Sequence, residues 1–216
     1  MARVDEVAVE ETGPTLLQMM ENAGRNLART TMAARPGLRR VTVLAGPGGN
    51  GGGGLCAARH LTNHGVEVSV VLDRDPEDLT SGTATQWDTL AATGIKPAVD
   101  AADAVARADI VVDALLGYGL DGPPHGRIAE LIDRSTEADY LVSLDVPSGV
   151  DATTGERPGG SVEPDRVLTL ALPKTGLTAV DGPVYLGDIG IPAVVYDQAG
   201  IDYESPFEGE YVVPLV

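Results

Sequence analysis

The chain has 216 residues, of which 43% are hydrophobic, and it carries a formal net charge of −17. This length is enough for one domain with its own hydrophobic core, and we treat residues 1–216 as a single domain. The negative charge argues against nucleic acid and anionic membrane surfaces as partners, because both are bound by basic surfaces. The single cysteine excludes an internal disulfide bond. Neither a signal peptide nor a membrane-spanning run is expected, so the sequence predicts a cytoplasmic protein.

Apolar residues recur at helical spacing after Pro14, and short β-branched runs follow further along the chain. We predict helices at residues 14–35, 55–63, 81–92, 101–107 and 128–134, and strands at residues 41–45, 67–72, 109–113, 140–144, 166–172 and 184–186. Strands that alternate with helices are typical of a mostly parallel sheet covered on both faces. The tail after about residue 198 is rich in glycine, proline and acidic residues, and we expect it to pack loosely at the surface.

Residues 46–54 read Gly-Pro-Gly-Gly-Asn-Gly-Gly-Gly-Gly and lie between the first predicted strand and a helix. Residues with so little side chain let a ligand reach the backbone, and the first N–H groups of a helix favour negative charge. We therefore predict a phosphate or pyrophosphate site here rather than a flexible linker. The same segment matches the dinucleotide fingerprint, with Asp73 as a candidate for a ribose hydroxyl, which taken alone would suggest a nicotinamide oxidoreductase.

Two acidic residues, Asp113 and Asp145, come directly at the ends of predicted strands. Because ligands bind at the carboxyl ends of parallel strands, we expect both carboxylates beside the glycine segment. Two carboxylates at an anion site repel the ligand unless a cation lies between them or one of them handles protons. Asn50 and Ser148 add neutral oxygens, and such an oxygen-only set suits a hard cation.

The remaining reactive side chains give weaker signals. Ser148 lacks the glycine two residues before it that a nucleophile elbow needs, which disfavours a hydrolase. Lys174 also follows a predicted strand, and it either neutralises phosphate at the edge of the site or is solvated. The three histidines are expected at the surface or in packing, and Cys56 is expected as a small buried apolar side chain.

Taken together, these segments resemble the NAD(P)H-hydrate epimerase family, the YjeF N-terminal domain. The similarity runs from about residue 4 to residue 192 and comprises several separated motifs in the right order. They are LQMMENAG at 17–24, AGPGGNGGGG at 45–54, VDALLGYGL at 112–120, LDVPSGVD at 144–151, LPKTGL at 172–177 and GDIGIP at 187–192. The resemblance implies a Rossmann-like three-layer α/β/α sandwich that is usually a homodimer.

The resemblance also implies an activity, a cofactor and a set of site residues. The activity is interconversion of the R and S epimers of hydrated NADH and NADPH, damaged cofactors whose product epimer feeds a separate ATP- or ADP-dependent dehydratase. The implied cofactor is a potassium ion held by Asn50, Asp113 and Ser148, and Asp145 is our choice for proton transfer. The implied substrate contacts are Gly49, Asn50, Gly51, Gly52, Gly53, Gly117, Tyr118, Gly119, Leu120, Asp121, Gly122, Pro123 and Asp145.

The chain departs from the family pattern in its glycine segment. The family usually reads Asn-Asn-Gly-Gly-Asp there, whereas residues 49–53 of this chain read Gly-Asn-Gly-Gly-Gly. The missing aspartate keeps a second interpretation open, in which the domain is a catalytically impaired nucleotide-binding or dimerising scaffold. Retention of Asn50, Asp113, Asp145 and Ser148 together favours the enzyme.

Overall fold

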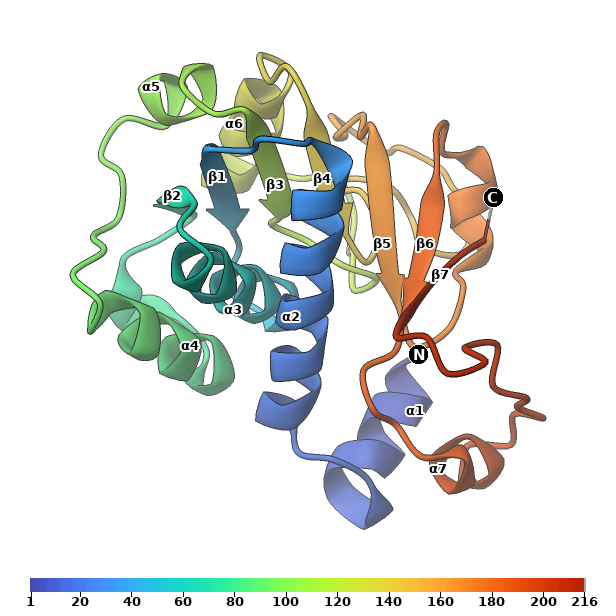
Figure 1. Cartoon of the computed structure of the whole chain (residues 1–216). Coiled ribbons are helices and arrows are strands. Elements are labelled where there is room, and N and C mark those ends of the chain that lie inside the picture. The colour runs from blue at the N-terminus through green and yellow to red at the C-terminus, as the bar shows by residue number, and fades with distance from the viewer. Residues whose placement is uncertain (216) are drawn as a thin grey trace.

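Seven strands form one sheet in the order β2-β1-β3-β4-β5-β6-β7 in a computed structural model that describes residues 1–215 (Figure 1). The strands are β1 (Arg40–Ala45), β2 (Glu67–Leu72), β3 (Ile110–Ala114), β4 (Leu141–Leu144), β5 (Arg166–Leu170), β6 (Val184–Gly187) and β7 (Val212–Pro214). The strands from β2 to β6 pair in parallel, and β7 joins the edge antiparallel to β6. The predicted mostly parallel sheet is therefore confirmed.

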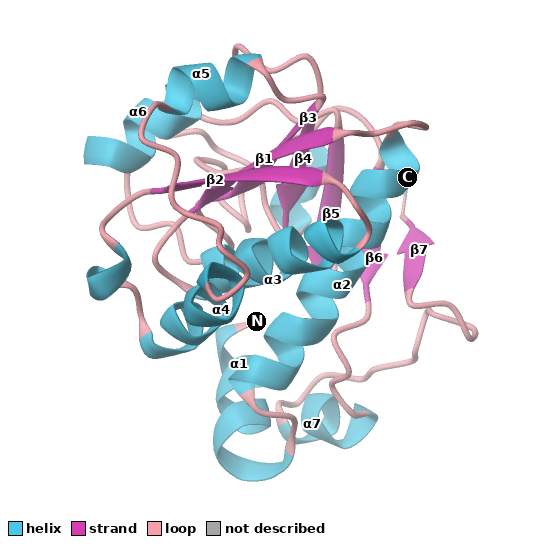
Figure 2. Ribbon diagram, turned by 60° about the vertical axis from the view of Figure 1, so that its left-hand side comes forward, coloured by secondary structure: helices cyan, strands magenta, loops and turns pink. Residues whose placement is uncertain are grey.

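Helices cover both faces of the sheet, as the pattern predicted. One face carries α2 (Leu16–Ala34), α3 (Gly49–Asn63) and α4 (Ser81–Ala91), and the other carries α5 (Ala101–Ala106) and α6 (Gly126–Ser135). Figure 2 shows α5 and α6 above the strands and α3 and α4 below them. Successive strand residues point to opposite faces, so Val43 belongs to one buried cluster and Leu44 to the other. The three-layer α/β/α sandwich is confirmed.

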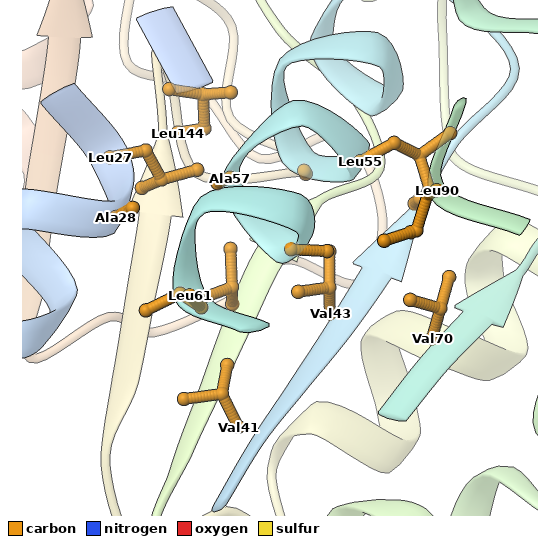
Figure 3. Close-up of a cluster of buried hydrophobic side chains, with 14 of the residues drawn as sticks. Leu27, Ala28, Val41, Val43, Leu55, Ala57, Leu61, Val70, Leu90 and Leu144 are labelled. Atoms are coloured by element: carbon orange, nitrogen blue, oxygen red, sulfur yellow. The ribbon is translucent and has the colours of Figure 1, made fainter. Parts of the chain in front are cut away.

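The larger buried cluster joins α3 to the middle of the sheet. Figure 3 shows Val41 and Val43 of β1 facing Leu55 and Leu61 of α3. Each of these four side chains is at most 1% exposed. Burial of such a side chain stabilises the fold by about 1.5–3 kcal/mol, which fixes the start of α3 against the ends of the strands.

The predicted start of α3 was wrong: the helix begins at Gly49, not at residue 55, and the glycines form its first turns. Glycine costs about 1 kcal/mol per residue inside a helix, so another effect must favour it here. A Cβ at Gly51 would overlap the carbonyl of Gly46, and one at Gly54 would lie 2.5 Å from Ala114 Cβ. The glycines therefore let the helix approach the strand ends more closely than any other residue would.

Several short elements, most of them toward the two ends of the chain, were not predicted. They are α1 (Ala2–Val7), the π-helical turn η1 (Ala8–Thr12), the 3₁₀ turns η2 (Pro76–Asp78) and η3 (Thr175–Ala179), α7 (Ala193–Gln198) and β7. Figure 1 shows α1 beside α7, where Val4 and Val7 pack against Val195 and Tyr196. Beyond residue 198, the ring of Tyr203 stacks on that of Tyr196 with centroids 4.0 Å apart. No helix within residues 1–215 is long and apolar enough to cross a membrane.

The strand order places a crevice at one edge of the sheet. From β1 the chain first moves to β2 on one side, and it then returns to β3 on the other side. In sheets of this order, ligands bind beyond the carboxyl ends of the strands where the order reverses. That position here is between the carboxyl ends of β1 and β3.

Candidate active site

The amino end of α3 lies at the point where the strand order reverses. Gly46 N donates to Ala114 O at 3.0 Å, and a Cβ at Gly46 would overlap the carbonyl of Leu115. The first intrahelical bond joins Gly52 N to Gly48 O at 3.0 Å, so the N–H groups of residues 49–51 precede it. N–H groups at the start of a helix favour anions, so the geometry is compatible with the phosphate or pyrophosphate site predicted for this segment.

A cavity of about 490 Å³ opens beside this helix end. Seven of the residues predicted to contact substrate line it, namely Gly49, Asn50, Gly53, Gly117, Tyr118, Gly119 and Asp145. Most of the other lining residues are apolar, and they come mainly from α2 and from the ends of β3, β4 and β5. The cavity therefore joins an anion-binding backbone to a carboxylate inside mostly apolar walls, a combination typical of small-molecule sites.

The other predicted contact residues lie elsewhere. Gly51 packs on Gly46, and a Cβ at Gly52 would lie 2.7 Å from Met20 Cε, so both glycines support α3 from within. Leu120, Asp121, Gly122 and Pro123 line a neighbouring cavity of about 320 Å³. The two cavities share Leu116 and Gly119, so the loop of residues 117–123 lies between them.

Asp145 follows β4 and holds an unusual backbone conformation. Its φ of 69° is in the left-handed region, where aspartate is tolerated at a cost of about 1 kcal/mol. The side chain is 7% exposed, and its Oδ1 accepts from Lys174 Nζ and from Leu170 N at 3.3 Å. Its Oδ2 lies 3.3 Å from the position that a Cβ at Gly117 would take. One carboxylate oxygen is thus held by the protein and the other faces the cavity.

Lys174 is the cation of this site. Its side chain is 5% exposed, and Nζ donates to Asp145 Oδ1 and, at 2.7 Å, to Leu170 O. The sequence left Lys174 open between a role at the edge of the site and full solvation. The structure buries it in the cavity wall. A buried carboxylate needs such a partner, because an uncompensated buried charge is strongly destabilising.

Asp113 lies behind the cavity and is fully buried. Its carboxylate accepts from Leu115 N at 3.2 Å, Ser143 Oγ at 2.8 Å, Ser148 N at 2.9 Å and Ser148 Oγ at 2.5 Å. Burial raises the pKa of Asp113, and these hydrogen bonds oppose the increase. Within residues 1–215 it has no ion pair with a protein cation.

The three predicted potassium ligands are joined through the peptide groups of Leu116. Asn50 Nδ2 donates to Leu116 O at 2.7 Å, while Ser148 Oγ accepts from Leu116 N at 2.9 Å and contacts Leu116 O at 3.3 Å. Asn50 Oδ1 faces the open side of Gly117. The oxygens of Asn50, Ser148 and Leu116 could all act as ligands of a metal ion. The buried negative charge of Asp113 beside them needs a positive charge to offset it. The residues present therefore fit a hard cation.

A sequence model of the family described as YjeF-related protein N-terminus matches residues 16–176. The chain belongs to this family. A protein of Dehalogenimonas lykanthroporepellens named NAD(P)H-hydrate epimerase is 50% identical over 221 residues, covering 100% of this chain and 90% of that protein. A Hyperthermus butylicus protein named bifunctional NAD(P)H-hydrate repair enzyme Nnr is 43% identical, covering 85% of this chain and 36% of its own length.

Among solved structures, the crystal structure of the yeast protein YNL200c matches with a TM-score of 0.85 at 24% identity. The match covers 99% of this chain and 96% of that one, and it shows a common fold. The resemblance read from the motifs is thereby confirmed at the level of the family. In this member of the YjeF-related family, the motif at residues 45–54 contributes Pro47, Gly48, Gly49, Asn50 and Gly53 to the cavity.

One acidic lining residue of this family member was missed by sequence reasoning altogether. Asp5 of α1 lines the cavity and accepts a hydrogen bond from Tyr118 Oη. Burial raises the pKa of Asp5, and burial together with the Asp5 contact raises the pKa of Tyr118. No sequence signal could have found Asp5, because its helix has only six residues and shows little periodicity.

The side chains of Cys56 and His60 lie outside the cavity and join α2 to α3. His60 Nε2 lies 2.8 Å from Glu21 Oε1, and Arg59 Nη2 donates to Glu21 Oε2 at 2.5 Å. Cys56 is fully buried, and burial raises the pKa of its thiol to about 12. The thiol is therefore not ionised at neutral pH, which agrees with the predicted packing role.

Proposed function

We propose that the chain interconverts the R and S epimers of hydrated NADH and NADPH in the 490 Å³ cavity. The observation that carries the proposal is the buried Asp145–Lys174 pair, which shares one cavity with the amino end of α3. The pair supplies a carboxylate for proton transfer, and the helix end supplies backbone N–H groups for a pyrophosphate. The names of relatives that match most of this chain support the same activity.

The substrate sets the chemistry that Asp145 would perform. Water adds to the reduced nicotinamide ring at a carbon bonded to the ring nitrogen, because that double bond is an enamine. The hydrate is therefore a carbinolamine, whose stereocentre inverts if the ring opens and closes on the other face. In opening, the hydroxyl loses its proton, a carbonyl forms, the C–N bond breaks, and the nitrogen keeps the electron pair and takes up a proton. Ring closure reverses these changes.

We assign the hydroxyl proton to Asp145 Oδ2, the oxygen that faces the cavity at Gly117. General base catalysis of this kind contributes about 10²–10⁴-fold to a rate. Lys174, which donates to the other oxygen, holds the carboxylate in place and offsets its charge. Lys174 is therefore a positioning residue, since its Nζ also donates to Leu170 O within the wall.

Pyrophosphate binding needs hydrogen-bond donors at the site itself, because the protein carries a net charge of −17 and repels anions at long range. The N–H groups at the start of α3 are such donors, and Gly48 and Gly49 have no side chains that would cover them. A Cβ at Gly48 would meet nothing within 4 Å, which leaves room for a ligand. The glycines that replace the usual family residues at positions 49 and 53 would enlarge this space.

We also propose a potassium ion at Asn50, Asp113 and Ser148, with the carbonyl of Leu116 beside them. The ion would supply a fixed positive charge that offsets the buried carboxylate and favours the anionic substrate. The donor set of carboxylate, amide, hydroxyl and carbonyl oxygens supports a hard cation rather than a transition metal.

The test uses purified protein and separated epimers of hydrated NADH. Chromatography follows the epimer ratio with time in potassium chloride and in choline chloride. The proposal predicts equilibration much faster than in buffer, and faster with potassium. Equilibration at the rate of the protein-free blank would favour the scaffold interpretation instead, and oxidation of intact NADH would favour an oxidoreductase.

We further propose that the protein acts in the cytoplasm as a homodimer and delivers its product to a separate ATP- or ADP-dependent dehydratase. The family resemblance supports the dimer, and the Hyperthermus relative named bifunctional is more than twice as long as the matched region. Light scattering after gel filtration tests the dimer, and a coupled assay with a purified dehydratase tests the sequence of reactions.

A further inference from the structure

A second cavity of about 320 Å³ lies next to the first one, and its lining includes Asp73 and Arg74, which have no part in the proposed reaction. Asp73 and Arg74 give this cavity charged lining, and Pro123, Pro124 and Ile128 give it apolar lining. The loop of residues 117–123 separates it from the cavity that holds Asp145. A ligand that crossed this loop would reach both cavities.

Asp73 has a buried oxygen that the protein does not satisfy. Its side chain is 3% exposed, and Arg74 donates to Oδ2 from Nε at 3.0 Å and from Nη2 at 2.9 Å. Oδ1 is buried and has no hydrogen-bond partner in the described part of the chain. A buried carboxylate oxygen without a donor is costly. Because Asp73 also lines the second cavity, Oδ1 is a candidate acceptor for a hydrogen bond from a ligand.

The position of Asp73 in the sheet indicates which ligand group this is. Asp73 follows β2, and its N donates to Ala45 O at 3.1 Å, directly before the glycine segment. Along the edge of the sheet, the strand order places Asp73 at β2, the amino end of α3 at β1, and Asp145 at β4. Three strand spacings of about 4.8 Å separate β2 from β4, which gives roughly 14 Å for the span of a dinucleotide.

We propose that Asp73 accepts a hydrogen bond from the 2′-hydroxyl of the adenosine ribose and makes the protein select hydrated NADH over hydrated NADPH, an inference that rests on the proposed function. The nicotinamide ring then lies at Asp145, the pyrophosphate at the start of α3, and the adenosine in the second cavity. In hydrated NADPH this hydroxyl carries a phosphate, which cannot donate to Oδ1 and which the carboxylate repels.

The cationic groups near the second cavity do not reverse this preference. Arg74 is engaged by Asp73 itself, and Arg127 Nη1 pairs with Glu130 at 3.0 Å. The carboxylate of Asp73 is the buried charge of this cavity, whereas the side chain of Arg74 is 41% exposed.

The experiment compares kcat/KM for hydrated NADH and hydrated NADPH at pH 8 in wild type, D73S and D88N. We expect wild type to favour hydrated NADH by about tenfold or more, and D73S to bring the ratio close to one. Asp88 is an exposed carboxylate of α4, so D88N removes the same net charge without touching the cavity. A ratio that D88N shifts as much as D73S does, or a wild-type ratio near one, would overturn the proposal.

Calorimetry separates failure of this proposal from failure of the proposed function. The probes are ADP-ribose and 2′-phospho-ADP-ribose, which bind without any epimerase step. Wild type is expected to bind ADP-ribose about tenfold more tightly, and D73S is expected to lose this preference. If the protein shows this binding preference but no epimerase activity, the role of Asp73 is supported and the proposed activity is wrong. If the enzyme is active but binds both probes with equal affinity, only the proposed role of Asp73 is wrong.

Discussion

Asp113 and Asp145 end neighbouring strands, β3 and β4, yet the protein surrounds them in opposite ways. Asp113 is enclosed by hydrogen-bond donors and makes no ion pair with a cation of residues 1–215. Asp145 is paired with Lys174 and turns one oxygen toward the cavity. The same pattern of a strand followed by an aspartate thus gives one carboxylate suited to binding a cation and one suited to proton transfer.

The difference comes from the segments that follow the strands. The chain after β4 folds back so that Ser148 donates to Asp113 from both its N and its Oγ. Asp145 itself adopts a left-handed conformation, and Lys174 reaches it from the segment after β5. The chemistry of a strand-end carboxylate is therefore decided by its neighbours in space, not by its place in the strand.

The largest effect is expected for D145N, which removes the base and keeps the shape. Asparagine also tolerates a positive φ, so the backbone should be retained. We expect kcat for epimerisation to fall at least about 100-fold with a smaller change in KM. D139N is the control, since Asp139 is exposed near the amino end of β4. Full activity in D145N would remove Asp145 from catalysis.

Replacement of Lys174 tests the cation that distinguishes the two sites. K174M leaves the buried Asp145 carboxylate unpaired, and we expect the free energy of unfolding to fall by about 3 kcal/mol. Urea denaturation measures this change, and the epimer assay should show a fall in kcat. Lys96 is the only other lysine of the chain and is exposed, so K96M should change stability by less than about 0.5 kcal/mol. Equal stability of the two variants would contradict the buried pair.

Potassium should act through Asp113 and depend on pH. Burial raises the pKa of Asp113 above its ordinary value of 3.8. The contribution of this carboxyl to the free energy of unfolding is therefore fully present below pH 3.8 and is lost as pH rises through the raised pKa. A bound cation offsets the loss by favouring the ionised carboxylate. The melting temperature in potassium chloride should therefore exceed that in choline chloride increasingly as pH rises, by about 2–4 °C per kcal/mol.

The choline salt controls for the effect of ionic strength. The variant S148A tests whether the potassium response depends on the proposed ligands. S148A should reduce the response to potassium, because it removes an oxygen that contacts both Asp113 and Leu116 O. A melting temperature that responds equally to both salts at every pH would argue against a potassium site.

The smallest effect is expected at the mouth of the cavity that holds Asp145. Y118F removes the hydroxyl that donates to the half-buried carboxylate of Asp5. We expect a loss of about 1 kcal/mol in the free energy of unfolding and a rise in KM with little change in kcat. Tyr211 is 64% exposed, so Y211F is the matched control. A large fall in kcat for Y118F would instead place the hydroxyl at the reacting atoms.

Much of the fold was readable because the strands and long helices carry clear periodic patterns. Helix α2 was placed within two residues at each end, since Pro14 precedes its start and Pro36 follows its end. The start of α3 could not be predicted, because glycine normally disfavours a helix and only the close contacts with Gly46 and Ala114 explain its presence. The short α1 and β7 depend on packing partners far along the chain.

The sequence by itself determined the alternation of strands and helices, the glycine segment and the strand-end carboxylates, because these follow from local patterns of residue type. Only the tertiary structure decided that Lys174 pairs with Asp145, that Ser148 encloses Asp113, and that Asp5 reaches the same cavity. Such contacts join residues from 29 to 113 positions apart, and side-chain partners at that separation are set by how the elements pack.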